Sequence, residues 1–342
     1  MSGLITRTPA HPPIIGAHGT ALALTLLLAS ALTGSGCGGT RATTHTAGSR
    51  SAATAVPAPV GLRIANTVQL PVAVQLPAVA PDGSGGLALG GLDSADASVS
   101  AIVSIDGSGA RTVGQLPAAR HDAAAADIEG QPYFFGGGDL GSASDLILRV
   151  GNRGSQVAGH LPVGASDIEA ATIGRTAYVV GGYTETTPLR TIVAFTPRTG
   201  ARVVGMLPRP LRYAAVAAVG GRLLIAGGTS GVLAQRAILS FDPSTGQVHQ
   251  IGLLPSPTTH AAGASLNGRF YVLGGRGENL EEQRSSILAV DPLTGAIAHA
   301  GHLPRPLSDL GVASLPGRIL LVGGRDSNGT TGDLALTLTP GR

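Results

Sequence analysis

Acidic, imidazole and phenol side chains recur at one fixed place in this sequence, six residues after the leucine of a repeated Leu-Pro pair. The six residues at this place are Leu76, Asp122, Asp167, Tyr213, His260 and Asp309. Carboxylates accept hydrogen bonds, and imidazoles and phenols can donate or accept them. If the fold brings these side chains together, they could bind a polar, hydroxyl-bearing or anionic small molecule.

Further charged side chains stand beside this place or follow a second marker, a glycine pair that begins 20 residues after each such leucine. Those that complete the set of candidate ligand-binding residues are Arg120, His121, Glu169, Arg212, Arg276 and Arg325. Acid–base catalysis needs a proton donor and a proton acceptor a few ångströms apart. His121, Glu169 and His260 are the residues on which we would test such an activity.

Most of these candidates also have a purely structural interpretation. Asp122, Asp167 and Asp309 precede predicted strands, where aspartate often accepts hydrogen bonds from backbone N–H groups of a turn. Histidines placed like His121 and His260 more often belong to a turn or to the wall of a channel than to an acid–base pair. The chain contains no H-x-x-x-H pair, no G-x-S-x-G elbow, no Walker loop and no Cys-x-x-Cys motif. We therefore expect no metal and no cofactor, and we assign no catalytic residue.

The Leu-Pro pairs and the glycine pairs keep the same spacing six times. The pairs begin at Leu70, Leu116, Leu161, Leu207, Leu254 and Leu303, and the glycine pairs at Gly90, Gly136, Gly181, Gly227, Gly274 and Gly323. Short apolar runs lie between these markers, and a turn rich in Pro, Asn, Asp and Gly follows each second run. Each unit of about 46 residues therefore predicts four short strands, which is the size of a propeller blade.

The repeat resembles the kelch motif, in which a hydrophobic run ends in Gly-Gly, the next run ends near Asp-Pro, and a Leu-Pro precedes the next blade. The resemblance covers residues 61–342, although the Trp and most of the Tyr residues usual in kelch blades are missing. It implies an all-β, six-bladed β-propeller with four-stranded blades. The last unit lacks its fourth strand, and residues 62–69 resemble a fourth strand with no unit before it, so we expect the N-terminal strand to close the last blade.

Composition supports this fold class and excludes others. More than a fifth of the 342 residues are glycine (52) or proline (23), whereas charged residues make up 13% and aromatic residues 3%. A hydrophobic share of 43% argues against disorder, and such sparse charge argues against a helical bundle. All 23 basic residues are arginines scattered along the chain, so we expect no nucleic-acid partner.

The N-terminal 37 residues read as an export signal. Residues 20–32 form an uncharged apolar run that is too short to span a bilayer as a helix. Gly34-Ser35-Gly36-Cys37 follows, which resembles the lipidation site of bacterial lipoproteins, although that motif prefers a leucine where Gly34 stands. Two alternatives stay open: cleavage after Ala29-Ser30-Ala31, which gives a secreted protein, and an uncleaved anchor.

Residues 38–60 are dominated by Ala, Thr, Ser and Gly and predict a flexible linker between this signal (1–37) and the propeller (61–342). We expect a monomeric, lipid-anchored protein outside the cytoplasm that binds a protein or a glycan. The alternative is a carbohydrate-active enzyme, because six-bladed kelch-like propellers include a sialic acid mutarotase. Fold analogy alone supports that alternative.

Overall fold

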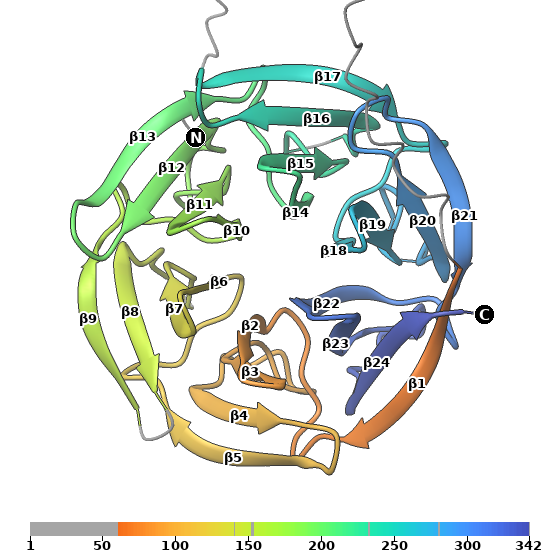
Figure 1. The fold of residues 1–342 in the computed structure, drawn as a ribbon. Coiled ribbons are helices and arrows are strands. Elements are labelled where there is room, and N and C mark those ends of the chain that lie inside the picture. The colour runs from red at the N-terminus through yellow and green to blue at the C-terminus, as the bar shows by residue number, and fades with distance from the viewer. Residues whose placement is uncertain (1–60, 140, 152–153, 232, 280, 342) are drawn as a thin grey trace, which may run out of the picture. The chain divides into compact units, whose positions relative to one another are not determined.

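The computed structural model describes residues 61–342, apart from residues 140, 152–153, 232, 280 and 342. They belong to one compact unit, Thr54–Arg342. The described residues form 24 strands in six sheets, and each sheet has four antiparallel strands. Viewed along their common axis, the sheets are arranged as the six blades of a β-propeller (Figure 1). This confirms the predicted fold class.

Five blades follow the chain from the innermost to the outermost strand. Their strands are β2 (Ala78–Asp82), β3 (Gly85–Leu89), β4 (Ala101–Ile105) and β5 (Ala110–Gln115); β6 (Ala124–Ile128), β7 (Gln131–Phe135), β8 (Leu146–Gly151) and β9 (Gly154–His160); β10 (Glu169–Ile173), β11 (Thr176–Val180), β12 (Thr191–Thr196) and β13 (Gly200–Met206); β14 (Ala215–Val219), β15 (Arg222–Ala226), β16 (Ala237–Asp242) and β17 (Gln247–Leu253); and β18 (Ala262–Leu266), β19 (Arg269–Leu273), β20 (Ser286–Val290) and β21 (Ile297–His302).

The sixth blade joins the two ends of the propeller. It consists of β22 (Ser308–Leu315), β23 (Arg318–Arg325), β24 (Leu334–Pro340) and, at its outer edge, β1 (Leu62–Gln69). Strand β1 pairs with β24 in an antiparallel register that runs from Leu62 opposite Pro340 to Gln69 opposite Leu334. The predicted closure by the N-terminal strand is therefore confirmed, and it gives β24 a partner on both sides.

The glycine pairs let neighbouring blades approach each other closely. Gly181 has a φ of 64°, and a Cβ atom there would clash with the carbonyl oxygen of Leu211 in the next blade. The N–H of the following glycine, Gly182, donates to that same carbonyl at 2.8 Å. The other five pairs repeat this arrangement. The repeated Gly-Gly thus marks a hydrogen bond between blades that no larger side chain allows.

Small inner strands and apolar layers between blades fill the rest of the ring. Alanine dominates the innermost strands, which crowd around the axis. Between the second and third blades, Phe195 packs edge-on against Tyr133 and Phe135, with ring centroids 5.4 and 5.6 Å apart. Such aliphatic and aromatic packing holds each blade against its neighbour.

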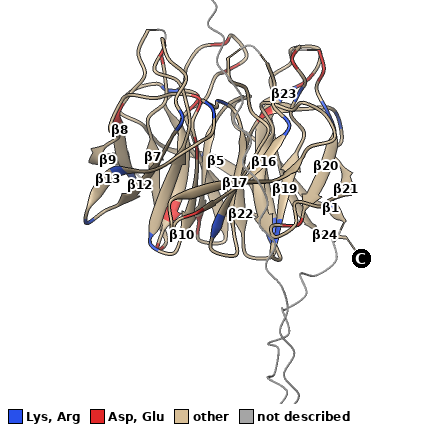
Figure 2. Ribbon diagram, turned by 90° about the horizontal axis from the view of Figure 1, so that it is seen from above, with Lys and Arg blue, Asp and Glu red and all other residues tan. Residues whose placement is uncertain are grey.

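The two ends of the strands carry different connections. The Leu-Pro segments and the loops after the glycine pairs share one end, where isolated bridges such as His121 to Gly138 join them. We call this end the loop face. The other end carries the tight turns between first and second strands and is called the hairpin face. In Figure 2 the charged residues lie mostly at these two ends, and the strands between them are mostly uncharged.

The predicted signal (1–37), its Cys37 and the linker (38–60) lie outside the described residues. Within the part of the chain that the structure describes, no helix has the length and apolar character needed to cross a bilayer.

Candidate functional site

The six residues that follow each Leu-Pro pair at the same distance meet around the axis at the loop face. They form what we call the axial ring: Leu76, Asp122, Asp167, Tyr213, His260 and Asp309. All six have a left-handed backbone, with φ between 52° and 60°. Such φ values are uncommon for residues other than glycine.

Backbone hydrogen bonds between neighbouring blades accompany this left-handed conformation. The N–H of Leu76 donates to the carbonyl of Asp309 at 2.8 Å, that of Asp309 to His260 at 3.1 Å, and that of His260 to Tyr213 at 3.0 Å. Tyr213 continues the series to Asp167 at 3.4 Å. From Asp167 round to Leu76, equivalent residues of adjacent blades are therefore in direct contact, which brings their side chains close together.

An ion pair between Asp167 and Arg212 forms one side of the ring. Both Nε and Nη2 of the guanidinium bond to Oδ2 of the carboxylate. The Asp167 side chain is only 4% exposed and that of Arg212 is 21% exposed. The guanidinium also lies over the ring of Tyr183, 4.1 Å from its centroid, and near that of Tyr213 at 5.2 Å. Arg212 is thus held rigidly, with part of its surface still facing solvent.

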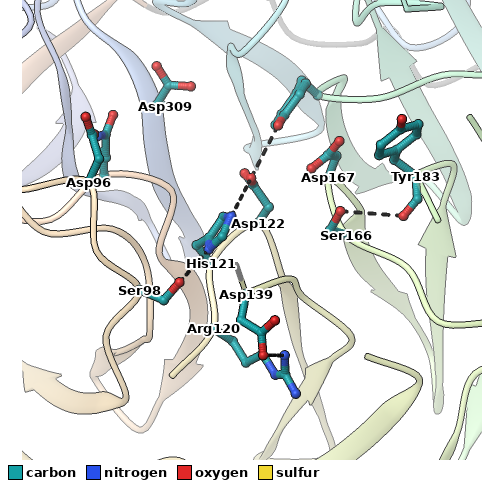
Figure 3. Close-up of polar contacts among 12 residues, drawn as sticks. Asp96, Ser98, Arg120, His121, Asp122, Asp139, Ser166, Asp167, Tyr183 and Asp309 are labelled. Carbon is teal, nitrogen blue, oxygen red and sulfur yellow. Dashed lines mark hydrogen bonds and ion pairs between the residues drawn. The ribbon is translucent and has the colours of Figure 1, made fainter. Parts of the chain in front are cut away.

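Asp122 is a second buried carboxyl group of the ring (Figure 3). The Tyr213 hydroxyl donates to its Oδ2 at 3.3 Å, and Nε2 of His121 lies 3.7 Å from the same oxygen. Its Oδ1 is buried and has no hydrogen-bond partner among the described residues. The other ring nitrogen of His121, Nδ1, lies 2.8 Å from Oγ of Ser98.

Burial and charge shift the pKa values of this pair in opposite directions. Desolvation, strengthened by the nearby carboxylates of Asp167 and Asp309, holds the pKa of Asp122 well above its usual range. Desolvation also lowers the pKa of His121, although Asp167 and Asp139 partly counteract this. At neutral pH this places an acid that retains its proton more strongly than usual beside an imidazole that tends to be neutral.

His260 occupies the other side of Tyr213, stacked on it with ring centroids 3.8 Å apart. Nη2 of Arg276 lies 3.0 Å from Nε2 of His260, and Oγ1 of Thr259 lies 3.1 Å from Nδ1. A guanidinium can only donate, so this geometry assigns the acceptor role to Nε2 and the proton to Nδ1. Burial and the charges of Arg276 and Arg212 keep the pKa of His260 well below its usual range, which agrees with a neutral ring.

Asp309 completes the ring beside His260. Its Oδ1 lies 3.8 Å from Nε2 of His260, and its Oδ2 accepts a hydrogen bond of 2.5 Å from Oγ of Ser308. Burial raises the pKa of Asp309, while the Ser308 hydrogen bond and Arg276 act to lower it. Nε of Arg276 is buried without a hydrogen-bond partner in the described part of the chain.

Three predicted residues lie outside this cluster. Arg120 forms an ion pair of 2.5 Å with Asp139 in the neighbouring loop (Figure 3), and Arg325 forms one of 3.0 Å with Asp96. Both pairs surround the ring on the loop face. Glu169 begins β10 and instead lines the central channel below the ring.

Some contacting residues were not among the sequence candidates, and a regular signal could have found them. Ser98, Thr259 and Tyr183 belong to the Leu-Pro segments or the loops that pair with them. In every blade the residue just before the axial ring pairs with the residue just after the glycine pair, as Ser166 does with Tyr183. The spacing of the two markers therefore predicts which loop side chains neighbour the ring.

The arrangement suits recognition of polar groups. It combines a paired guanidinium, two neutral imidazoles and two carboxyl groups of raised pKa. Over the described ranges, no group of three or more His, Cys, Asp or Glu side chains has the geometry to hold a metal ion.

Comparison with known proteins supports the fold. No protein-family model matches the chain, and no curated protein matches it at a significant level. Among solved structures, that of YjhT superimposes with a TM-score of 0.68 and 17% sequence identity, over 79% of this chain and 96% of YjhT. At this identity the similarity shows a shared β-propeller fold.

Proposed function

We propose that the protein is a kelch-like binding propeller outside the cytoplasm, whose loop face recognises a polar, hydroxyl-bearing ligand such as a glycan, free or attached to a partner protein. The axial ring and the loop residues around it would form the binding surface. Paired guanidinium and carboxyl groups with neighbouring imidazoles can both donate to and accept from sugar hydroxyl groups.

The observation that carries this proposal is the contrast between Leu76 and its five counterparts in the ring. Leu76 has the same left-handed backbone as the polar members, and it donates the same hydrogen bond to the neighbouring blade as Tyr213, His260 and Asp309. The fold therefore does not require a polar side chain at this position. Burying Asp122 and Asp309 costs folding free energy, since both pKa values are raised. A recognition role accounts for side chains that the fold itself does not need.

A thermal-shift screen of residues 38–342 against neutral and anionic glycans tests this function. We expect at least one class of sugar to raise the melting temperature. Asp167→Asn should abolish the shift, because it releases Arg212 from its fixed position. His249→Gln on the outer strand β17 is the matched control and should retain the shift. A ligand that stabilises the Asp167→Asn variant as much as the parent would contradict a site at the axial ring.

A second candidate, a sugar mutarotase, is favoured by the pairing of Asp122 with His121. Mutarotation opens a hemiacetal ring, which needs an acid to protonate the ring oxygen and a base to take the proton of the anomeric hydroxyl. Asp122 Oδ2 and His121 Nε2 lie 3.7 Å apart and have pKa values shifted towards those two roles. Accelerated mutarotation of a reducing sugar in polarimetry, lost in His121→Gln, would support the enzyme over the binding module.

The proposed location rests on Cys37. Lipidation there would attach the propeller to the outer face of the membrane through the linker of residues 38–60. A Cys37→Ala variant should move from the detergent phase to the aqueous phase in a partitioning experiment. Continued partitioning into detergent would instead favour an uncleaved N-terminal anchor, and an aqueous parent protein would favour simple secretion.

A further inference from the structure

A cavity of about 350 Å³ occupies the central channel on the hairpin side of the axial ring. The inner strands of all six blades contribute to its wall, which consists mainly of alanine, glycine and valine. It reaches the hairpin turns at Glu129 and Gly174. None of the six ring residues lines it, so this space is separate from the surface proposed for glycan binding.

Glu169 breaks the symmetry of this wall. The equivalent residues in the other blades, each placed opposite the residue before the glycine pair, are Ala78, Ala124, Ala215, Ala262 and Gly311. Across the described residues, the Glu169 carboxyl has neither a hydrogen bond nor an ion pair. Glu169 is partly buried in this alanine layer, and a carboxylate desolvated in this way without a partner lowers the stability of the fold unless something else compensates it.

The charges around the cavity have one sign. Its lining includes three acidic residues, Asp127, Glu129 and Glu169, and no arginine. Asp127 accepts a hydrogen bond from the N–H of Gly130, and Glu129 pairs with Arg175 at 2.8 Å. Glu169 is therefore the lining carboxyl group that has neither a hydrogen bond nor an ion pair among the described residues. Its enclosure raises its pKa to about 8 by desolvation.

The cavity wall also restricts the kind of cation that could balance Glu169. A divalent metal prefers six or more oxygen ligands, and one carboxylate among alanines does not provide them. A quaternary ammonium is usually held by aromatic rings, and none lines this cavity. A primary ammonium needs one anion and a few hydrogen-bond acceptors, and its alkyl chain suits an alanine wall. Ser265 and Ser314 place hydroxyl groups along the same wall.

We propose that the channel is a binding site for a slender primary alkylammonium, entered from the hairpin face, with the ammonium on the Glu169 carboxylate and the chain along the alanine wall. This site is independent of the glycan surface on the loop face. Glu169 supplies the counter-ion, and the small residues at the equivalent positions leave the space that the chain fills.

Calorimetric titration of the full chain with n-butylammonium tests the proposal. We expect binding that strengthens up to tenfold per pH unit as the pH rises towards 8, since only the ionised carboxylate pairs with the cation. The other titratable groups that line the cavity are Asp127 and Glu129. Asp122, Asp167, Tyr213, His260 and Asp309 belong to the axial ring and do not line it.

Three comparisons make the result decisive. Glu169→Gln should weaken binding at least tenfold and remain folded, as circular dichroism would show. Glu129→Gln at the mouth should change affinity less than threefold, because Glu129 is exposed and already paired. n-Butanol should not compete. Equal affinity in Glu169→Gln, effective competition by n-butanol, or no ammonium binding between pH 7 and 9 would each overturn the proposal, whatever the glycan screen shows.

Discussion

The two ends of the channel carry carboxyl groups in contrasting surroundings. At the loop face, Asp122 and Asp167 accept hydrogen bonds from Tyr213 and Arg212 of other blades, and Asp309 accepts one from the adjacent Ser308. On the hairpin side, Glu169 stands alone in a layer of alanine and glycine. The loop-face carboxyl groups have side-chain hydrogen-bond partners, whereas Glu169 has no hydrogen-bond partner or ion pair among the described residues.

The two arrangements suit the recognition of different ligands. A network whose members bind one another is rigid and is ready to recognise a shape with several polar groups. A single unpaired acid specifies a single opposite charge. Both carry a stability cost, but removing a partner from the network should destabilise the protein, while neutralising the lone acid should stabilise it.

The largest effect should come from opening the ring, on which both ends of the channel depend. Deleting residues 61–70 removes β1 and leaves β24 without its outer partner. We expect the deletion variant to lose its single cooperative unfolding transition in a thermal melt followed by circular dichroism. A variant that melts as sharply and at the same temperature as the parent would show that closure is dispensable.

The next effect should come from breaking the network at the loop face. Asp167→Ala leaves the largely buried guanidinium of Arg212 without its carboxylate, and we expect a loss of about 3 kcal/mol in the free energy of unfolding. Chemical denaturation measures it. Glu169→Ala is the matched control from the other end of the channel and should not destabilise. An equal loss of unfolding free energy in both variants would show that the carboxyl groups at the two ends of the channel contribute to stability in the same way.

Sequence reasoning reached the fold because each marker has one structural task. Gly-Gly is required where a Cβ atom would clash with the next blade, as at Gly181. The regular spacing of the Leu-Pro and Gly-Gly pairs predicted the number of blades and the strand that closes the last one. It also brought the ring residues to one place. The place of Glu169 was harder to predict from the sequence. Glu169 lies only two residues after Asp167, but it begins β10 and its side chain lines the channel.

The connections within the site could not be predicted in the same way. The Leu-Pro and Gly-Gly pairs predict the path of the backbone but not the side-chain contacts. Arg212 pairs with Asp167 of the preceding blade, whereas Arg120 pairs with Asp139 in the neighbouring loop. Those choices depend on side-chain rotamers and on the neighbouring loops, which differ in length and composition from blade to blade.

A smaller effect of opposite sign is expected from Glu169→Gln. The folded state holds the Glu169 proton up to about pH 8, whereas the unfolded chain releases it near pH 4.5, so the parent loses stability as the pH rises between these values. The variant has no carboxyl group to ionise here, so it should be more stable than the parent at pH 8. We expect a gain of about 1–3 kcal/mol, smaller than the full pKa shift implies, because the carboxyl group is partly exposed to solvent. Unfolding midpoints measured from pH 4 to 9 would show the two curves diverging; parallel curves would mean that the carboxyl group is solvated.

The smallest effect should come from Asp122→Asn, which keeps an oxygen for the Tyr213 hydroxyl and removes only the ability of the side chain to ionise. Because the pKa of Asp122 is raised in the folded state, the parent protein loses stability as the pH rises above the unfolded pKa near 3.8. We expect the variant and the parent to have the same free energy of unfolding at pH 3.5. At pH 7 the variant should be more stable by about 1 kcal/mol. Asp106→Asn in an exposed turn is a control of opposite sign, because the hydrogen bonds from Ser108 lower the pKa of Asp106. Replacing the Asp106 carboxylate should therefore destabilise the protein at neutral pH. The substitution should have no effect once the pH falls below the lowered pKa of Asp106. If Asp122→Asn instead destabilises at pH 7, Asp122 is ionised in the folded protein, and the acid required by the mutarotase candidate is absent.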